Sequence, residues 1–389
     1  MKHASLLRLL ALCLALLLTS CAAVGTSPKP RLVVLFVIDG LPQRQVTAYR
    51  DQLAPDGFAR FLQRGASFEQ AHYGYAFTVT GAGHATVLSG AYPHRSGIIG
   101  NEWLDPATGK AMYCTGDPSA TYIGHKTAAL DGTSPRNLKV ETLGDVLRRV
   151  DPRSKVIAVS GKDRGAILPA GHSGTAYMYM ADDGGFASTT YYMREHPGWV
   201  DAFNAGKPAD RYFKTEWKPL LPDAAYAGAV PDDQPWFGAG GGHLPMTPGG
   251  AEAAPNPRFY AALLPSPFID ALTLDFARAA IAGEKLGADD APDILSISLS
   301  GHDYVNHRWS AESRLSQDHF LQLDRLLQAF FADLDHTVGR DNYVAVLTAD
   351  HGFMPAPEVS QARGESAGRI SSTQVLAAVN GALEQRFRA

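Results

Sequence analysis

The sequence has very little cysteine. Its 389 residues include three cysteines, and two of them, Cys13 and Cys21, lie in or directly after an apolar N-terminal segment. Cys114 is then the single cysteine of the remaining chain, and a single cysteine can form neither an intrachain disulfide nor a thiolate zinc site. We therefore expect Cys114 to be a small buried hydrophobic side chain.

The chain also lacks a strong excess of either charge. Its 35 Lys and Arg residues and 39 Asp and Glu residues give a formal net charge of -4, which provides no electrostatic reason to bind nucleic acid. Hydrophobic residues at 45% and charged residues at 19% are ordinary for a soluble globular protein. The length is sufficient for one large core with an insertion. On the charge balance, no nucleic-acid partner is predicted.

A hydrophobic run long enough to span a membrane is missing from the N-terminal segment. The run Leu9–Leu18 follows Lys2, His3 and Arg8, and it is too short to cross a bilayer as a mature helix. A basic start followed by a short apolar run is typical of a targeting segment. The residues Leu18-Thr19-Ser20-Cys21 resemble a bacterial lipoprotein box, although plain signal-peptidase cleavage after a small residue is the alternative.

The lipoprotein interpretation fixes the expected location. Residues 1–20 are predicted to be a lipoprotein signal peptide, and residues 21–30 a tether that begins at an acylated Cys21. Ala22 and Ala23 lack the aspartate that retains lipoproteins in the inner membrane. We therefore expect a periplasmic protein anchored to the outer membrane, with the lipid at Cys21 as its sole membrane contact.

Four apolar runs rich in β-branched residues predict the strands of a central sheet. They lack the alternation of a half-exposed strand, which favours strands covered on both faces. Helical patterns separate them, so the chain is predicted to be α/β, with a doubly wound, mostly parallel sheet. Its ligand site should lie beyond the carboxyl ends of the strands. The predicted strands are 31–38, 155–160, 294–299 and 343–348, and the predicted helices are 141–150, 268–286 and 313–334.

Residues 165–265 interrupt this rhythm. The segment is rich in tyrosine, glycine and proline, and it contains the run Gly240–Gly242. We interpret it as an inserted lid region over the site. The catalytic core is then expected to comprise residues 31–164 and 266–389.

Ionisable residues follow the predicted strands. Asp39 follows the first strand, Asp303 and His307 follow the third, and Asp350 and His351 follow the fourth. Carboxylates and imidazoles without thiolates suit zinc, and a spacing of four places Asp303 and His307 on one face of a helical turn. The alternatives are that Asp39 and Asp350 cap helices and that His307 is an ordinary surface residue.

The stretch Phe77–Gly90 combines two threonines, three glycines and a histidine before an apolar run. It predicts a tight turn leading into a helix, where glycines allow close approach to a ligand and the helix N-terminus favours an anion. A glycine-punctuated loop is the alternative. The Thr80 hydroxyl becomes a good nucleophile only when its pKa is lowered, and two metals about 4 Å apart would do that. Asn101, Lys162 and Arg164 would supply the donors that phosphoryl transfer needs.

Six motifs follow one another along the chain: Val37-Ile38-Asp39-Gly40, Thr80-Gly81-Ala82-Gly83-His84, Gly97-Ile98-Ile99-Gly100-Asn101-Glu102-Trp103, Gly161-Lys162-Asp163-Arg164, Asp303-Tyr304-Val305-Asn306-His307 and Thr348-Ala349-Asp350-His351-Gly352. Together they resemble the alkaline phosphatase superfamily, specifically its bacterial alkaline phosphatases with a threonine nucleophile. The type I phosphodiesterases and nucleotide pyrophosphatases are close relatives. The resemblance covers the chain from Leu32 to about Gly352.

The resemblance implies a sheet of the alkaline phosphatase type and a zinc-dependent hydrolase of phosphate monoesters. Thr80 would be the nucleophile and would form a covalent phosphothreonine intermediate, while His84 would be a structural residue. The pair Lys162 and Arg164 favours small dianionic monoesters over diesters, and a sulfatase motif is missing around Cys114. By this resemblance one zinc would be held by Asp39, Thr80, Asp350 and His351, the other by Asp303 and His307, and the phosphate by Asn101, Lys162 and Arg164.

One ligand of the family pattern is missing. Family members supply a third ligand to the second zinc from a histidine well downstream of the Asp-His-Gly motif, and no histidine follows His351 here. Either the sequence lacks a C-terminal part or another group, such as His302 or His172, completes the site. A phosphodiesterase or nucleotide pyrophosphatase with the same core is one alternative function. A catalytically impaired, lipid-tethered binding protein is the other.

Overall fold

The computed structural model describes residues 29–238 and 241–387. The predicted signal peptide, Cys21 and almost all of the predicted tether lie outside the described residues. Within the described ranges, no helix is both long and apolar enough to cross a membrane.

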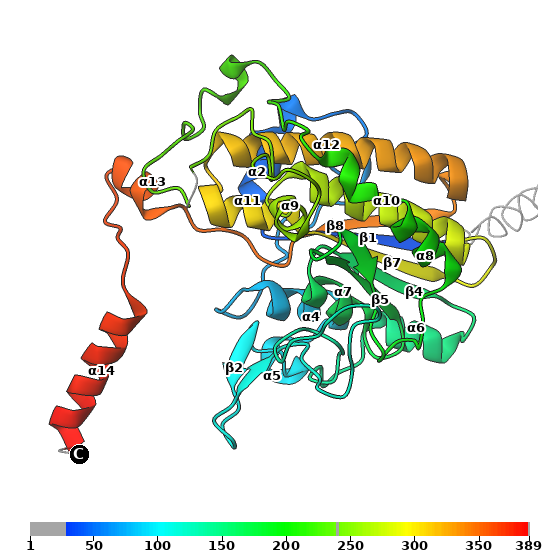
Figure 1. Ribbon diagram of the computed structural model, residues 1–389, viewed down its shortest axis with the longest axis horizontal. Coiled ribbons are helices and arrows are strands. Elements are labelled where there is room, and N and C mark those ends of the chain that lie inside the picture. The colour runs from blue at the N-terminus through cyan, green and yellow to red at the C-terminus, as the bar shows by residue number, and fades with distance from the viewer. Residues whose placement is uncertain (1–28, 239–240, 388–389) are drawn as a thin grey trace, which may run out of the picture.

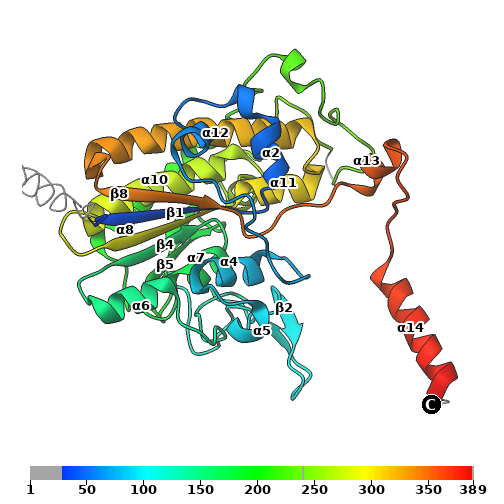
Figure 2. The ribbon, with the colours of Figure 1, turned by 180° about the vertical axis from the view of Figure 1, so that it is seen from behind.

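A six-stranded sheet forms the centre of the molecule, in the order β6-β5-β4-β7-β1-β8 (Figures 1 and 2). All neighbouring pairs are parallel except β5 and β6, which are antiparallel. This is the mostly parallel α/β sheet that the sequence predicts. The strands are β1 (Leu32–Ile38), β4 (Val156–Ser160), β5 (Thr175–Met180), β6 (Gly185–Ala187), β7 (Asp293–Leu299) and β8 (Tyr343–Thr348), with a separate hairpin of β2 (Glu102–Leu104) and β3 (Ala111–Tyr113).

Helices cover both faces of the sheet. In Figures 1 and 2, α10, α11 and α12 lie on one side of it, and α4, α6 and α7 lie on the other. The α-helices are α2 (Gln43–Ala48), α3 (Phe58–Arg64), α4 (Thr80–Ser89), α5 (Pro93–Ser96), α6 (Leu143–Val150), α7 (Asp163–Ala170), α8 (Gly198–Ala205), α9 (Pro257–Ala262), α10 (Pro267–Glu284), α11 (Gly301–Trp309), α12 (Arg314–Leu334), α13 (Pro357–Ala362) and α14 (Ser372–Phe387). Short 3-10 or π turns are η2 (Arg50–Gln52), η3 (Pro208–Tyr212), η4 (Asp223–Tyr226) and η5 (Asp335–Gly339).

The burial of strand β1 on both faces explains why apolar and polar residues do not alternate along it. Phe36 packs edge-on against Phe330 of α12, with ring centroids 5.7 Å apart. Leu35 and Val37 on the opposite face pack against Leu88 of α4. Burial on both faces requires apolar residues at successive positions, so the continuous run is the sequence signature of a central strand. Cys114 is fully buried in an apolar cluster, as expected.

The first part of the predicted lid region belongs to the α/β core, with residues 165–170 in α7 and the next segments in the sheet. Residues 175–180 form β5 beside β4, and residues 185–187 form the edge strand β6. Tyr177 and Tyr179 are buried in the main core, because aromatic side chains pack well on a covered sheet. The tyrosine-rich composition therefore misplaced the boundary of the insertion.

The remainder of the predicted lid region supports helix α11. Trp217, Phe237 and Leu244 join one buried cluster with Val305 and Trp309 of α11. This packing fixes the helix that follows β7. The role of the segment as a lid stays a prediction.

Helix α14 extends away from the rest of the chain in Figures 1 and 2, and none of its residues is buried. It makes no contribution to the core described above.

Candidate functional site

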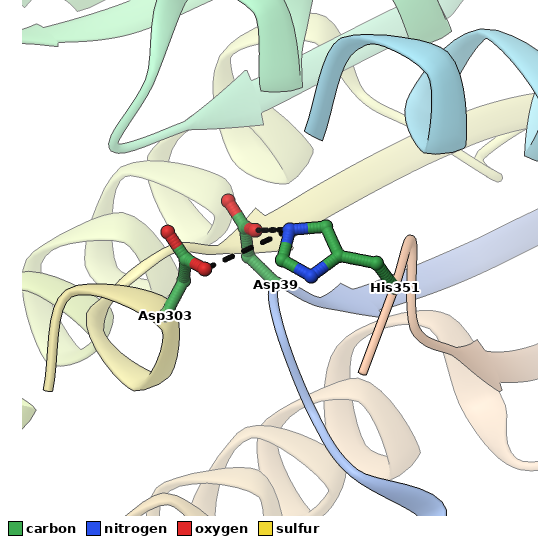
Figure 3. Close-up of side chains that lie close together, drawn as sticks. All are labelled: Asp39, Asp303 and His351. Atoms are coloured by element: carbon green, nitrogen blue, oxygen red, sulfur yellow. Dashed lines mark ion pairs between the residues drawn. The ribbon is translucent and has the colours of Figure 1, made fainter. Parts of the chain in front are cut away.

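Three side chains from three neighbouring strands meet at one edge of the sheet (Figure 3). Asp39 directly follows β1, Asp303 lies in α11 after β7, and His351 lies three residues after Thr348, the end of β8. The Nε2 atom of His351 is 3.5 Å from Asp39 Oδ1 and 3.7 Å from Asp303 Oδ1. All three residues are buried. We call this group the strand-end cluster.

Thr80 and Asp350 border the strand-end cluster. Thr80 is the first residue of α4, and its Oγ1 atom lies 3.5 Å from His351 Nε2. Asp350 Oδ2 lies 3.6 Å from the same nitrogen. The other carboxylate oxygen, Oδ1, accepts hydrogen bonds from the backbone N–H groups of Gly40 at 3.0 Å and His351 at 2.9 Å. Asp350 therefore ties the β1 and β8 loops together.

The glycines after Thr80 allow close packing of backbone against backbone. A Cβ atom at Gly83 would lie 2.2 Å from the carbonyl oxygen of Asp350, and one at Gly81 would lie 2.9 Å from that of Gly100. The structure shows close approach of α4 to the β8 loop at Gly83 and to the loop before β2 at Gly81. Glycine is required here because no side chain fits between them. Close approach of these glycines to a ligand stays a prediction.

His84 connects α4 to the sheet beneath it. Its Nδ1 atom lies 2.9 Å from the carbonyl oxygen of Thr80 and 3.1 Å from Asp350 Oδ2, and its Nε2 atom lies 2.7 Å from Ser298 Oγ. Burial opposes the charge of the imidazole, but the neighbouring Asp350 and Asp39 outweigh it and raise the pKa of His84. The expected structural role for His84 agrees with these contacts.

His307 lies one turn after Asp303, as the spacing predicts. Its Nε2 atom is 3.3 Å from Asp303 Oδ1, and its side chain is 65% exposed. His302 and His172 were the alternatives for completing the second site, and in this structure both ring nitrogens of each have protein partners. His302 contacts His319 and Gln45. His172 contacts Asp145 and the Leu138 carbonyl oxygen.

The electrostatics of the strand-end cluster suit a divalent cation. Asp39 Oδ1 and Asp303 Oδ1 accept no hydrogen bond from any residue that the structure describes. Burial, followed by repulsion from Asp303 and Asp350, raises the pKa of Asp39 to about 7. Buried carboxylate oxygens that accept no hydrogen bond are costly, and a cation bound between them removes that cost. Carboxylate oxygens with an imidazole nitrogen form a donor set that fits zinc and several other divalent ions.

Lys162 lies against the same carboxylates. Its Nζ atom is 2.7 Å from Asp39 Oδ2, forms an ion pair with Asp303, and lies 4.8 Å above the ring of Tyr304. Burial opposes the charge of the ammonium group, but Asp39 and Asp303 outweigh it and raise the pKa of Lys162. Burial likewise opposes the charge of Asp303, and Lys162 and His307 hold its pKa well below the usual range.

Asn101 lies close to the start of α4, and Arg164 lies in α7. Asn101 Oδ1 accepts a hydrogen bond of 2.7 Å from the Gly81 backbone N–H, which leaves its amide NH2 group as a donor. Arg164 Nη1 donates to the Tyr113 hydroxyl at 2.9 Å. Tyr113 was missed by the sequence reasoning, and its place at the end of a three-residue strand carries no motif that would have revealed it.

The fold and the strand-end cluster together define an α/β protein of the alkaline phosphatase type. The chain belongs to the type I phosphodiesterase / nucleotide pyrophosphatase family, whose model matches residues 33–370.

Similar proteins and solved structures agree with this family assignment. Alkaline phosphatase PhoV of Synechococcus elongatus is 38% identical over 343 residues, which cover 85% of this chain. Alkaline phosphatase PafA of Elizabethkingia meningoseptica is 36% identical over 365 residues, covering 93% of this chain. The crystal structure of wild-type PafA matches with a TM-score of 0.84 at 34% identity, over 94% of this chain and 70% of that chain. A PafA variant with a threonine, an asparagine, a lysine and an arginine replaced matches with a TM-score of 0.86, at 33% identity, over 93% of this chain and 70% of that chain.

The relatives are longer than this sequence. The matched part of the chain spans 60% of the length of PhoV and 67% of the length of PafA.

Proposed function

We propose that this protein hydrolyses small phosphate monoesters through a covalent phosphothreonine intermediate at Thr80. The observation that carries the proposal is the convergence of Thr80, at the N-terminus of a ten-residue helix, with Asp39, Asp303 and His351 at the strand ends. A helix N-terminus favours a bound anion, and the cluster provides ligands for a cation beside it.

Two zinc ions are proposed as cofactors. When bound, the metal lowers the pKa of the attacking hydroxyl and neutralises the leaving oxygen. Asp39, Thr80, Asp350 and His351 are the proposed ligands of one ion, and Asp303 and His307 those of the other. The unpartnered carboxylate oxygens of the cluster support metal binding. The contact of 3.3 Å between Asp303 and His307 supports their pairing.

In the proposed reaction, the Thr80 hydroxyl loses its proton and its Oγ1 atom forms a bond to phosphorus. The bond between phosphorus and the leaving oxygen breaks at the same time, and the alcohol departs after gaining a proton. Water then attacks the phosphothreonine, releasing phosphate and restoring the hydroxyl. Asn101, Lys162 and Arg164 hold the nonbridging oxygens during both steps.

Two features support this assignment of donors. Lys162 lies beside Asp39 and Asp303, so a phosphoryl group held at the cluster would be within its reach. In addition, the PafA variant is substituted at a threonine, an asparagine, a lysine and an arginine. Those are the residue types that Thr80, Asn101, Lys162 and Arg164 present in this chain.

The decisive variant is Thr80→Ala, with Thr86→Ala as the matched control. Thr86 is buried in the same helix, and its hydroxyl donates to the Ala82 carbonyl oxygen. We expect Thr80→Ala to lower kcat/KM for p-nitrophenyl phosphate by about a thousandfold or more, while Thr86→Ala retains activity. Acid-quenched wild-type enzyme should yield a phosphopeptide containing Thr80. Full activity in Thr80→Ala would overturn the proposal.

The second candidate function is hydrolysis of phosphodiesters, and the family description favours it. The two candidates differ in the charge that the substrate presents to Lys162 and Arg164. Two cations suit a dianionic monoester better than a monoanionic diester. We therefore expect p-nitrophenyl phosphate to be preferred over bis-p-nitrophenyl phosphate, and a strong diester preference would replace the first candidate with the second.

We also propose export to the periplasm and a lipid anchor on Cys21 in the outer membrane. The apolar run before Leu18-Thr19-Ser20-Cys21 supports the proposal. Labelled palmitate should be incorporated into the wild-type chain and not into Cys21→Ser. Incorporation into both chains would contradict an anchor at Cys21.

A further inference from the structure

The β2–β3 hairpin places Asn101 and Tyr113, two residues of the candidate site, side by side. Glu102 pairs with Tyr113 in its antiparallel register, and the Cys114 backbone N–H donates to the Asn101 carbonyl oxygen at 2.8 Å. Asn101 and Tyr113 thus occupy the two ends of the hairpin, side by side. Asn101 contacts the start of α4, so the hairpin is joined to the helix that carries Thr80.

The Tyr113 hydroxyl links the hairpin to α7. It accepts a hydrogen bond of 2.9 Å from Arg164 Nη1 and donates one of 2.6 Å to Asp163 Oδ1. Asp163 is itself held by the Gly132 backbone N–H, which donates to Oδ2 at 2.8 Å. Burial and the charge of Asp163 raise the pKa of Tyr113, so the hydroxyl keeps the proton that it donates.

The orientation of Arg164 depends on this hydroxyl. Arg164 Nε has no hydrogen-bond partner among the described residues, and its ion pair with Asp163 is long at 3.9 Å. The Tyr113 contact is the one side-chain hydrogen bond of this guanidinium group in the described structure. Arginine has many rotamers, so a single well-placed contact reduces the entropy that ligand binding must overcome.

We propose that Tyr113 is a positioning residue that holds the Arg164 guanidinium beside Asn101, so that both meet one tetrahedral oxyanion such as a phosphoryl group. The inference rests on the proposed function, because it assigns Arg164 to the phosphate. Tyr113 does not touch the reacting atoms and acts through Arg164. The hairpin would thereby set the spacing between two donors that come from different parts of the chain.

A double-mutant cycle tests this role. Tyr113→Phe keeps the ring and removes the hydroxyl, and we expect it to lower kcat/KM for p-nitrophenyl phosphate by about tenfold. In an Arg164→Ala background the same substitution should have almost no effect, because the group that it positions is gone. The affinity for inorganic phosphate, measured by calorimetry, should follow the same non-additive pattern.

Tyr260→Phe is the matched control. Tyr260 is as buried as Tyr113, at 7% and 8% exposure, and its hydroxyl also donates to an aspartate, Asp210, at 2.7 Å. The Tyr260→Phe variant should leave turnover and phosphate affinity unchanged. Equal losses from Tyr113→Phe with and without Arg164 would overturn the inference while leaving the proposed function intact. An inactive wild-type enzyme that still shows the cycle in phosphate affinity would overturn the proposed function and support the positioning role.

Discussion

Two groups of side chains in the described structure bring a histidine and two aspartates together, and their surroundings are opposite. The strand-end cluster of Asp39, Asp303 and His351 is buried where three parallel strands end. The second group, His125 with Asp182 and Asp183, lies at the surface, and its aspartate side chains are 55% and 56% exposed. The residue types are the same, so the surroundings must decide what each group does.

In the exposed group the charges need no metal. His125 Nδ1 lies 2.9 Å from Asp182 Oδ2, an ordinary contact between a histidine and a carboxylate, and both aspartate side chains are exposed to solvent. Such exposed pairs contribute about 0–1 kcal/mol. In the strand-end cluster, by contrast, Asp39 and Asp303 each retain a buried oxygen without a hydrogen bond. Burial makes those unpaired oxygens costly, and this difference is why we propose the strand-end cluster as the metal site.

The largest effect should come from the strand-end cluster itself. Asp39→Asn removes a buried carboxylate from the proposed metal ligands, and we expect turnover of p-nitrophenyl phosphate to fall by about a thousandfold or more. Bound zinc, measured by mass spectrometry, should fall as well. Circular dichroism should show a retained fold, because asparagine has nearly the same volume. Normal zinc content with normal turnover would remove Asp39 from the site.

A smaller effect is expected at His307, which touches the strand-end cluster from its exposed side. The substitution His307→Ala should lower turnover by about tenfold to a hundredfold, a loss typical of weakening a metal site without destroying it. Added zinc should restore part of the activity, because the site loses affinity rather than its buried ligands. If His307→Ala lowers turnover as much as Asp39→Asn does, and added zinc restores none of it, then the exposed fraction of a ligand does not indicate its contribution to this site.

The smallest effect is expected in the exposed group. His125→Ala should change neither zinc content nor turnover, and the melting temperature should stay within a few degrees of wild type, since exposed ion pairs contribute little. Loss of one bound zinc in His125→Ala would contradict the distinction between the two groups.

The sequence predicted most of what depends on regular patterns. The continuous apolar runs located β1, β4, β7 and β8 to within a residue or two, because strands buried on both faces have an unmistakable composition. Parallel strands end at one edge, so Asp39, Asp303 and His351 were expected to converge there, and they do.

The features that the sequence did not predict depend on packing between distant segments. Strand β5 was assigned to the lid region, because Tyr177 and Tyr179 resemble the aromatics of an irregular loop until the sheet buries them. Tyr113 meets Arg164 across 51 positions of the chain, and its role follows from the register of a short hairpin. Gly81 and Gly83 lie against the backbone of Gly100 and Asp350, and the motif alone did not predict these contacts between distant segments.

The most direct test of the account is to measure zinc content and p-nitrophenyl phosphate turnover on one purified sample, before and after chelation. We expect bound zinc, turnover that disappears on chelation and returns with added zinc, and a lower melting temperature in the metal-free protein. A metal whose free concentration is about a thousand times its dissociation constant stabilises the native state by about 4 kcal/mol. A folded protein that binds no divalent metal and turns over no phosphate ester would contradict it.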